Sequence, residues 1–201
     1  LVVMHNHREL SGWPGKGCER QGYLLGMLVG DGLLKAEAAV LSVWESASDV
    51  VNGETVRSLG SYSLMRAVED AASVIKRRSD STGWSKVAGR SEYRFKMAGL
   101  RDLALEYGMA VGNKCISPEI EKASSSFYRG FLRGFFDADG SVQGDQEKGA
   151  SVRLAQSDLE RLQAVQRMLA RLGIASTLYA NRREAGERPM PDGKGGSKLY
   201  R

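Results

Sequence analysis

The sequence predicts an α+β fold made of two copies of one unit, and three observations lead to this prediction. A glycine-rich segment at residues 22–32 returns at residues 130–140, with the constant offset of 108. Each copy has the periodicity of a helix, and segments with strand-like composition or alternation follow it. The order helix, strands, helix then occurs twice within 201 residues, enough chain for one large domain or two small ones.

The repeat preserves its small residues and an acid. The matched pairs are Gly22 and Gly130, Gly26 and Gly134, Gly30 and Ala138, and Asp31 and Asp139. Because the small residues recur every four positions, they line one face of a helix. Glycine costs a helix up to ~1 kcal/mol per residue relative to alanine, so we expect close packing of the two helices to offset that cost. Such self-similarity indicates two copies of a supersecondary unit related by a pseudo-twofold axis.

Local patterns predict the remaining elements. Strands are expected at residues 39–44, 92–97, 150–155 and 174–179. Helices are expected from a Ser63 cap to residue 75, at residues 100–107 with closure at Gly108, and at residues 159–172 between a Ser157-Asp158 cap and Gly173. Residues 182–198 are rich in glycine, proline and charge, which predicts a long loop or a hairpin arm.

Composition narrows the class of protein. The net charge of +5 and the isoelectric point near 9.3 favour a polyanionic partner. Two cysteines, Cys18 and Cys115, show no metal-binding spacing and fit a reducing compartment, so a cytoplasmic location is expected. The longest apolar stretch, residues 23–30, is far below the ~20 residues of a membrane span, so no membrane association is expected.

The two matched acids predict a metal site. If the glycine-faced helices pack on each other, Asp31 and Asp139 emerge at the same end. Two adjacent carboxylates repel each other, and a bound cation relieves that repulsion. Oxygen ligands favour Mg²⁺ or a similar hard ion. The alternative for each aspartate alone is a helix C-cap or a solvated turn.

The second copy of the repeat closely resembles a known signature. Residues 132–140 read LRGFFDADG and resemble the nine-residue LAGLIDADG motif of homing endonucleases, and residues 24–32, LLGMLVGDG, resemble a divergent partner motif. The resemblance implies two αββαββα repeats with paired central helices and saddle-shaped antiparallel sheets. It also implies that Asp31 and Asp139 are catalytic. The motif has an earlier acid as well, which is present as Asp137 in the second copy, whereas the matching position of the first copy holds Val29.

Flanking segments resemble intein-embedded members of this family. Residues 114–118, KCISP, are similar to the Lys-x-Ile-Pro block of such endonucleases, and residues 23–32 and 152–158 are similar to inteins of adenosylcobalamin-dependent ribonucleotide reductases. The expected division is a remnant of a splicing domain or linker at 1–19, a first repeat at 20–125 and a second at 126–201. Lys114 follows Asp31 by 83 residues, and the same interval after Asp139 would reach position 222, so the second repeat is expected to be truncated.

The resemblance implies a metal-dependent endonuclease that cuts both strands of a long DNA site at an intein insertion locus. Asp31 and Asp139 would hold Mg²⁺ or Mn²⁺, helped by the backbone carbonyls of Gly30 and Ala138. Lys114 would polarise the attacking water or neutralise the transition state. The alternatives are that Lys114 is an ordinary surface lysine, or that Lys96 takes this role.

DNA binding in the resembled family uses two antiparallel sheets in the major groove. Residues 57–101 contain ten Lys or Arg and four acids. Candidate DNA contacts are Arg94 and Lys96 on one strand face, Arg153 and Gln156 in the second copy, and Arg182 and Arg183 in the polar arm.

Two rival interpretations stay open at this point. The first is a non-catalytic LAGLIDADG protein, either an RNA maturase or a DNA-binding regulator, and the presence of both Asp31 and Asp139 speaks against it. The second is an unrelated basic α+β binding domain, which the constant-offset repeat disfavours. Two motifs in one chain make a monomer sufficient.

The two halves of the site are expected to be unequal, because the truncated second repeat would lack a lysine that matches Lys114. Cutting of one DNA strand is therefore expected to be faster than cutting of both.

Overall fold

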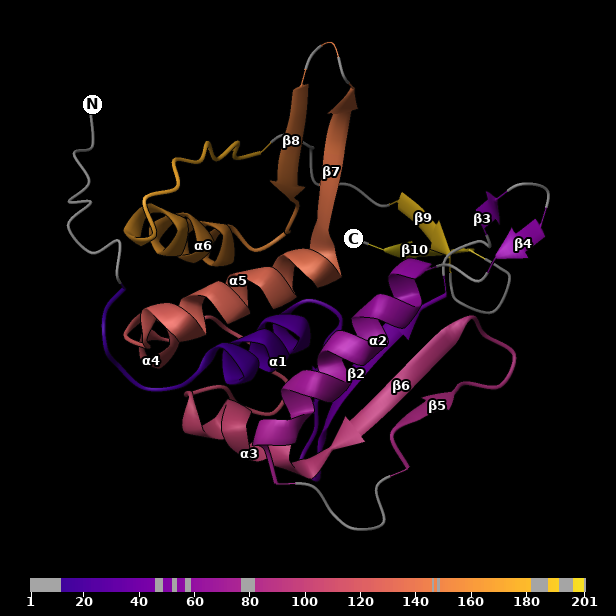
Figure 1. Ribbon diagram of the computed structural model, residues 1–201, viewed down its shortest axis with the longest axis horizontal. Helices are drawn as coiled ribbons and strands as arrows, with labels where there is room; N and C mark the ends of the chain where they lie inside the picture. The colour runs from indigo at the N-terminus through magenta and orange to yellow at the C-terminus, as the bar shows by residue number, and fades with distance from the viewer. Residues whose placement is uncertain are drawn as a thin grey trace.

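The computed structural model describes residues 12–45, 49–51, 54–56, 59–76, 82–145, 147, 149–181, 188–191 and 197–200, and within them the protein is an α+β fold (Figure 1). Its helices are α1 (Glu19–Val29), α2 (Leu59–Ala71), the 3-10 turn η2 (Ala72–Val74), α3 (Ala98–Glu106), α4 (Pro118–Glu121), α5 (Ser125–Asp139) and α6 (Leu159–Arg171). Its strands are β1 (Gly32–Leu34), β2 (Ala39–Trp44), β3 (Asp49–Val51), β4 (Glu54–Val56), β5 (Trp84–Lys86), β6 (Glu92–Met97), β7 (Gly140–Asp145), β8 (Gly149–Leu154), β9 (Arg188–Pro191) and β10 (Ser197–Tyr200).

Helices α1 and α5 pack side by side at the centre of the molecule (Figure 1). Their glycines lie at the contact: a methyl group added to Gly26 would overlap the backbone carbonyl oxygen of Phe131, and one added to Gly134 would overlap that of Tyr23. Gly22 and Gly130 are equally close to the backbone of the opposite helix. The two backbones therefore approach to a distance that leaves no room for side chains.

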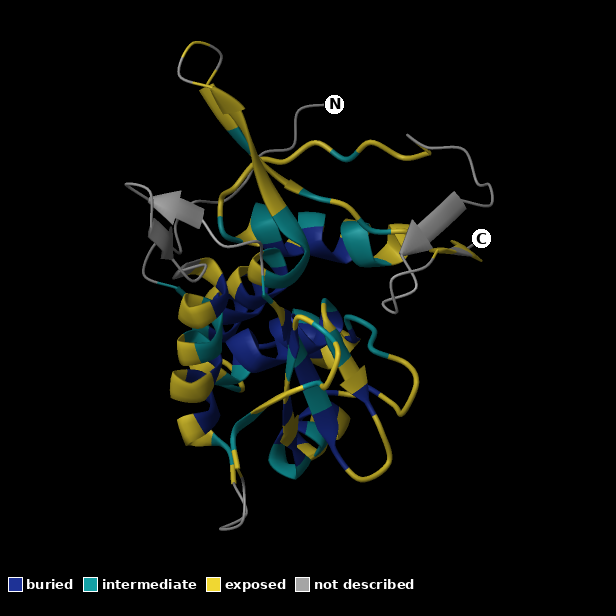
Figure 2. Ribbon diagram, turned by 90° about the vertical axis from the view of Figure 1, so that its right-hand side faces the viewer, coloured by how far each residue is buried: buried dark blue, intermediate teal, exposed yellow. Residues whose placement is uncertain are grey.

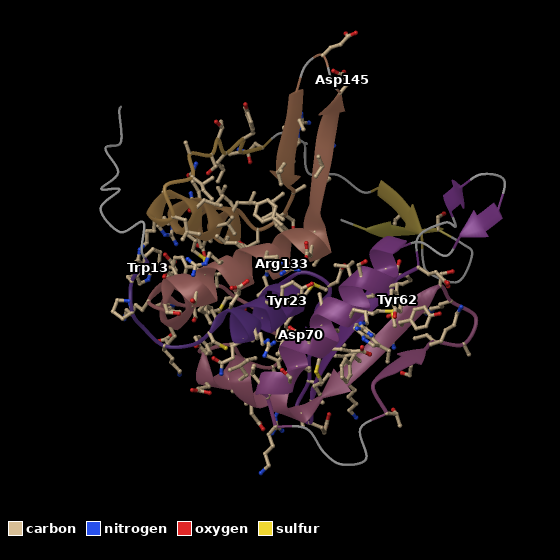
Figure 3. All side chains as sticks on the ribbon, in the orientation of Figure 1. Trp13, Tyr23, Tyr62, Asp70, Arg133 and Asp145 are labelled. Atoms are coloured by element: carbon tan, nitrogen blue, oxygen red, sulfur yellow. The ribbon has the colours of Figure 1, made fainter. Side chains whose placement is uncertain are left out.

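Side chains at the edge of this helix pair are polar. The guanidinium of Arg133 on α5 lies 5.2 Å from the centre of the Tyr23 ring on α1 (Figure 3). The Tyr23 hydroxyl donates a 3.0 Å hydrogen bond to Asp137 Oδ2. These contacts join the two helices outside their glycine faces.

The first half of the chain builds an antiparallel sheet in the strand order β1-β2-β6-β5. Residues alternate on β2, so that Ala39, Leu41 and Val43 enter the core while the residues between them face outward. The first half follows the order α1, β1, β2, α2, β5, β6, α3, with the β3–β4 hairpin inserted before α2. Figure 2 shows that buried residues gather between this sheet and the helices.

The second half is less buried. Strands β7 and β8 form a two-stranded ribbon that projects from the end of α5, and most of its residues are exposed (Figures 1 and 2). Strands β9 and β10 form the hairpin expected within the polar arm. Arg182 and Arg183 lie outside the described residues. The expected relation of the two halves by a twofold axis stays a prediction.

Most expected elements are confirmed, and two expectations are wrong. Residues 174–179 do not form a strand: the Ile174 backbone N–H instead donates to the Leu169 carbonyl in the cap that ends α6 after Gly173. Ser63 does not cap α2, because α2 already begins at Leu59. A hydrogen bond from Ser61 Oγ to the Trp44 carbonyl holds its first turn, a tertiary contact that local periodicity does not reveal.

The segment before α1 is fixed to the start of α5. Trp13 Nε1 donates a 2.9 Å hydrogen bond to the Ala123 carbonyl, and Ser124 N donates to the Lys16 carbonyl at 3.0 Å.

Among the described residues, no helix combines the length and apolar character needed to cross a membrane.

The glycine contact predicts the sign of a mutation. Gly26→Ala should raise helix propensity, yet it should lower the free energy of unfolding by about 1–3 kcal/mol because the methyl group overlaps the Phe131 carbonyl. Urea unfolding would measure the change, with the exposed Ser63→Ala on α2 as the control expected within ~0.5 kcal/mol of wild type. A Gly26→Ala protein as stable as wild type would contradict the close contact.

Candidate functional site

Asp31 and Asp139 come together because the ends of α1 and α5 touch. Asp139 is the last residue of α5, and Asp31 follows the C-cap of α1 at Gly30. A methyl group added to Gly30 would lie 2.5 Å from Ala138 Cβ and 3.2 Å from Asp139 Oδ2. The small residues at this level of the helix pair therefore set the separation of the two acids.

The environment of Asp31 disfavours its charged form. Its pKa is raised to about 6, first because the surrounding protein removes water from the carboxyl group and second because Asp139 adds a nearby negative charge. The positive charge of Lys114 opposes this shift. The residue as a whole still reaches solvent, so the site is open to a ligand.

Lys114 lies beside the first acid. It occupies the segment between α3 and α4, and its Nζ donates hydrogen bonds to the carbonyls of Gly30 at 3.0 Å and Gly32 at 2.5 Å. Burial and the charge of Arg161 lower the pKa of Lys114, whereas Asp139 and Asp31 raise it. Lys96, the competing lysine, lies on the exposed face of β6, whereas Lys114 bonds the carbonyls on either side of Asp31.

A glutamine and an arginine complete the second acid's surroundings. Gln156 Nε2 donates a 2.6 Å hydrogen bond to Asp139 Oδ2. Arg161, in the first turn of α6, donates through Nη1 to Gln156 Oε1 at 3.1 Å and through Nη2 to the Lys114 carbonyl at 3.3 Å. Sequence reasoning missed Arg161, since no motif marks it and its contacts arise only when α6 packs near residue 114.

The two acids have different partners. Gly32 pairs with Leu41 and Gly140 pairs with Leu154, so the position that matches Gln156 in the first half is Val43. Val43 is 3% exposed and belongs to the core. The first half therefore has no amide at the matching position, and Asp31 faces Lys114 instead.

Arg94 and Arg153, two of the DNA-binding candidates, have exposed side chains on β6 and β8. Arg94 is half-exposed on β6, where its guanidinium is bonded to the buried carboxylate of Glu92. Arg153 on β8 donates to Ser151 Oγ at 3.0 Å and to Gln143 Oε1 at 2.5 Å. Gln156 donates to Asp139 Oδ2, and its contact with DNA stays a prediction.

The oxygen atoms at this site suit a hard metal cation whose other ligands would be water and substrate oxygens. In the part of the chain that the structure describes, no group of three or more His, Cys, Asp or Glu side chains converges on a point. The two carboxylates and the neighbouring backbone carbonyls are all oxygen donors. Mg²⁺ is commonly bound by one or two carboxylates together with water and substrate phosphates, so the set fits Mg²⁺ or Mn²⁺.

These features define an α+β protein with paired acids at the ends of two packed helices. Residues 126–200 match the LAGLIDADG-like domain family. This part of the chain is therefore similar to a LAGLIDADG-like domain, as its sequence motif predicts.

The chain also resembles two curated proteins. It is 27% identical over 183 residues to the ribonucleoside-diphosphate reductase NrdEB subunit alpha of Bacillus subtilis (strain 168) and, to the same extent, to that of Bacillus phage SPbeta. Each match covers 89% of this chain and 16% of the relative, so the chain spans about a sixth of their length. The predicted similarity to ribonucleotide reductase sequences is confirmed. The names of these relatives do not mention adenosylcobalamin, so that part of the prediction stays a prediction.

The buried Glu92 predicts how stability depends on pH. Burial alone would raise the pKa of Glu92, but hydrogen bonds from Arg94 and Ser42 and the charges of Arg94 and Arg90 lower it overall. Glu92→Gln should therefore reduce the free energy of unfolding at pH 7 by about 1–2 kcal/mol. Because the native pKa lies below the unfolded value of ~4.3, this difference should shrink as the pH falls below about 4.

Urea unfolding at neutral and acidic pH would measure this difference. The exposed Glu106→Gln is the matched control, for which a change within ~0.5 kcal/mol at every pH is expected. A Glu92→Gln deficit that stays constant with pH would contradict a charged, hydrogen-bonded Glu92.

Proposed function

We propose that this protein is a site-specific, metal-dependent DNA endonuclease of the intein homing type, which cleaves a long double-stranded site at an intein insertion locus. The observation that carries the proposal is the pair Asp31 and Asp139 at the touching ends of α1 and α5, with Lys114 beside them. The match of residues 126–200 to the LAGLIDADG-like domain supports the same class of activity.

Asp31 and Asp139, with the carbonyl of Ala138, are the residues that would hold Mg²⁺ or Mn²⁺; the carbonyl of Gly30, the fourth expected ligand, accepts a hydrogen bond from Lys114 in this structure. When bound, such a metal activates a water and stabilises the leaving 3′ oxygen in an in-line attack on phosphorus. Burial is the main cause of the raised pKa of Asp31, and the nearby charge of Asp139 adds to it; two carboxylates this close favour an added positive charge.

Lys114 supplies the protein's own positive charge at the first acid. Its ammonium is fixed by the carbonyls of Gly30 and Gly32, so it is placed to neutralise charge that develops on a phosphate or to polarise the attacking water. Gln156 orients Asp139 by donating to Oδ2, which leaves Oδ1 for another partner. The two half-sites thus use different helpers.

Double-stranded DNA is the partner that charge and architecture favour. The net charge of +5 and the exposed basic side chains of β6 and β8 provide contacts to phosphates and base edges. Similarity to ribonucleoside-diphosphate reductase subunits supports a ribonucleotide reductase gene as the host and as the source of the target. A monomer suffices, because one chain carries both acids.

Plasmid cleavage tests the nuclease. With Mg²⁺ or Mn²⁺, wild type should cut a plasmid that carries the uninterrupted ribonucleotide reductase gene, and Asp31→Asn or Asp139→Asn should slow cleavage at least about 100-fold. Asp102→Asn, an exposed acid on α3, is the control that should leave cleavage unchanged. A wild type that binds this DNA but never cuts it would favour a non-catalytic regulator.

Unequal half-sites predict the order of events. In a time course on supercoiled plasmid, open-circular DNA should accumulate before linear DNA, because the two acids have different polar partners. Gln156→Ala should slow one of the two strand cuts by roughly 10- to 100-fold, the usual effect of losing a residue that orients a metal ligand. Direct conversion to linear product, or equal slowing of both cuts, would contradict this asymmetry.

A further inference from the structure

An arginine on the exposed face of the first sheet is held by a buried acid. Arg94 Nε donates to Glu92 Oε1 at 2.6 Å, and Arg94 Nη2 donates to Glu92 Oε2 at 3.1 Å. Ser42 Oγ donates to Oε1 at 2.9 Å, and Arg90 Nη1 lies 3.7 Å from Oε2. The side chain of Glu92 is only 2% exposed, whereas that of Arg94 is 45% exposed.

This pair differs from an ordinary surface ion pair. Exposed pairs hold their partners loosely and contribute little to stability. Glu92, in contrast, is excluded from solvent and has both carboxylate oxygens occupied, so it holds the guanidinium in one orientation. A flexible arginine would suffice for a phosphate contact, so an anchor of this kind indicates a ligand that requires a defined orientation.

The hydrogen bonds to Glu92 leave one edge of the guanidinium available. Of its five N–H groups, one on Nε and one on Nη2 are used by Glu92. Those that are left include both N–H groups of Nη1 and one of Nη2, which lie in the same plane. Two such parallel donors match O6 and N7 of guanine in the major groove.

We infer that Arg94, anchored by Glu92, reads a single guanine in the DNA target and is a specificity-determining residue. The inference rests on the proposed function in that it takes DNA as the ligand, but it does not require cleavage. Lys96, two residues along the same face, has no comparable anchor among the hydrogen bonds of the described residues and contacts phosphate only.

Sheet register places this residue near the acids. Gly32 pairs with Leu41, and Leu41 pairs with Phe95, so the residue after Asp31 and the residue after Arg94 lie at one level across two strand spacings. Strands lie ~4.8 Å apart, which makes this lateral separation about 10 Å. The guanine is therefore expected within a few base pairs of the phosphodiester bond that would be cut near Asp31.

Binding selection from a randomised DNA library tests the inference. The full chain, without divalent metal, would be mixed with duplexes that carry a random central segment, and bound DNA would be sequenced. Wild type should require guanine at one position, and Arg94→Ala should reduce that preference roughly 5- to 150-fold while leaving other positions unchanged. Arg94→Lys should reduce it as well, because an ammonium lacks the planar fork.

Two further variants separate anchoring from charge. Glu92→Gln should weaken the preference at the same position, and the double variant Glu92→Gln with Arg94→Gln, which avoids an unpaired buried acid, should lose it. Lys96→Ala is the matched control on the same strand face. It should weaken binding to all sequences alike and reduce the slope of log binding constant against log salt concentration by about one. Circular dichroism melting would establish that each variant is folded.

The outcomes distinguish this inference from the proposed nuclease. A wild type without a guanine position, or folded Arg94 variants that weaken all sequences equally, would overturn the reading of guanine by Arg94. Selective binding without any cleavage would overturn the nuclease and leave the role of Arg94 standing. Absence of DNA binding by wild type would overturn both.

Discussion

The backbone contact between α1 and α5 is the constraint on which the rest of the structure depends. Glycines at matching positions let each helix lie directly against carbonyl groups of the other, and no larger residue fits there. That approach continues to the helix ends, where Gly30 meets Ala138 and thereby brings Asp31 close to Asp139. Glycine in a helix lowers its intrinsic stability, so the cost is offset by packing of the surrounding aromatic and aliphatic core.

Charge is the second consequence of this contact. Two acids at one helix-pair end would destabilise each other, and the protein offsets this with Lys114 near one acid and Gln156 near the other. Arg161 links these two helpers by bonding both Gln156 and the backbone of residue 114. The site is thus a small network in which each charged or polar group limits the orientation of the next.

The sequence predicts the helix pair and its acids because that information repeats along the chain at a fixed offset. It predicts β2 and β6 because their alternation is local. It does not predict Arg161, whose contact with residue 114 spans 47 positions and has no local signature. The strand expected at residues 174–179 fails for a related reason: apolar residues there suit a strand, but pairing partners and the helix cap at Gly173 decide the outcome.

The same contacts explain why the motif carries its earlier acid in one copy only. Asp137 accepts a hydrogen bond from the hydroxyl of Tyr23 across the helix pair. At the offset of 108, the residue that matches Tyr23 is Phe131, which has no hydroxyl, and the residue that matches Asp137 is Val29, which is 1% exposed. A carboxylate at position 29 would be buried without the tyrosine hydroxyl that Asp137 has, at a substantial desolvation cost. Two identical subunits would have the same residues at both pairs of positions. A single chain that contains both halves can have the polar residues Tyr23 and Asp137 in one pair and the apolar residues Phe131 and Val29 at the matching positions.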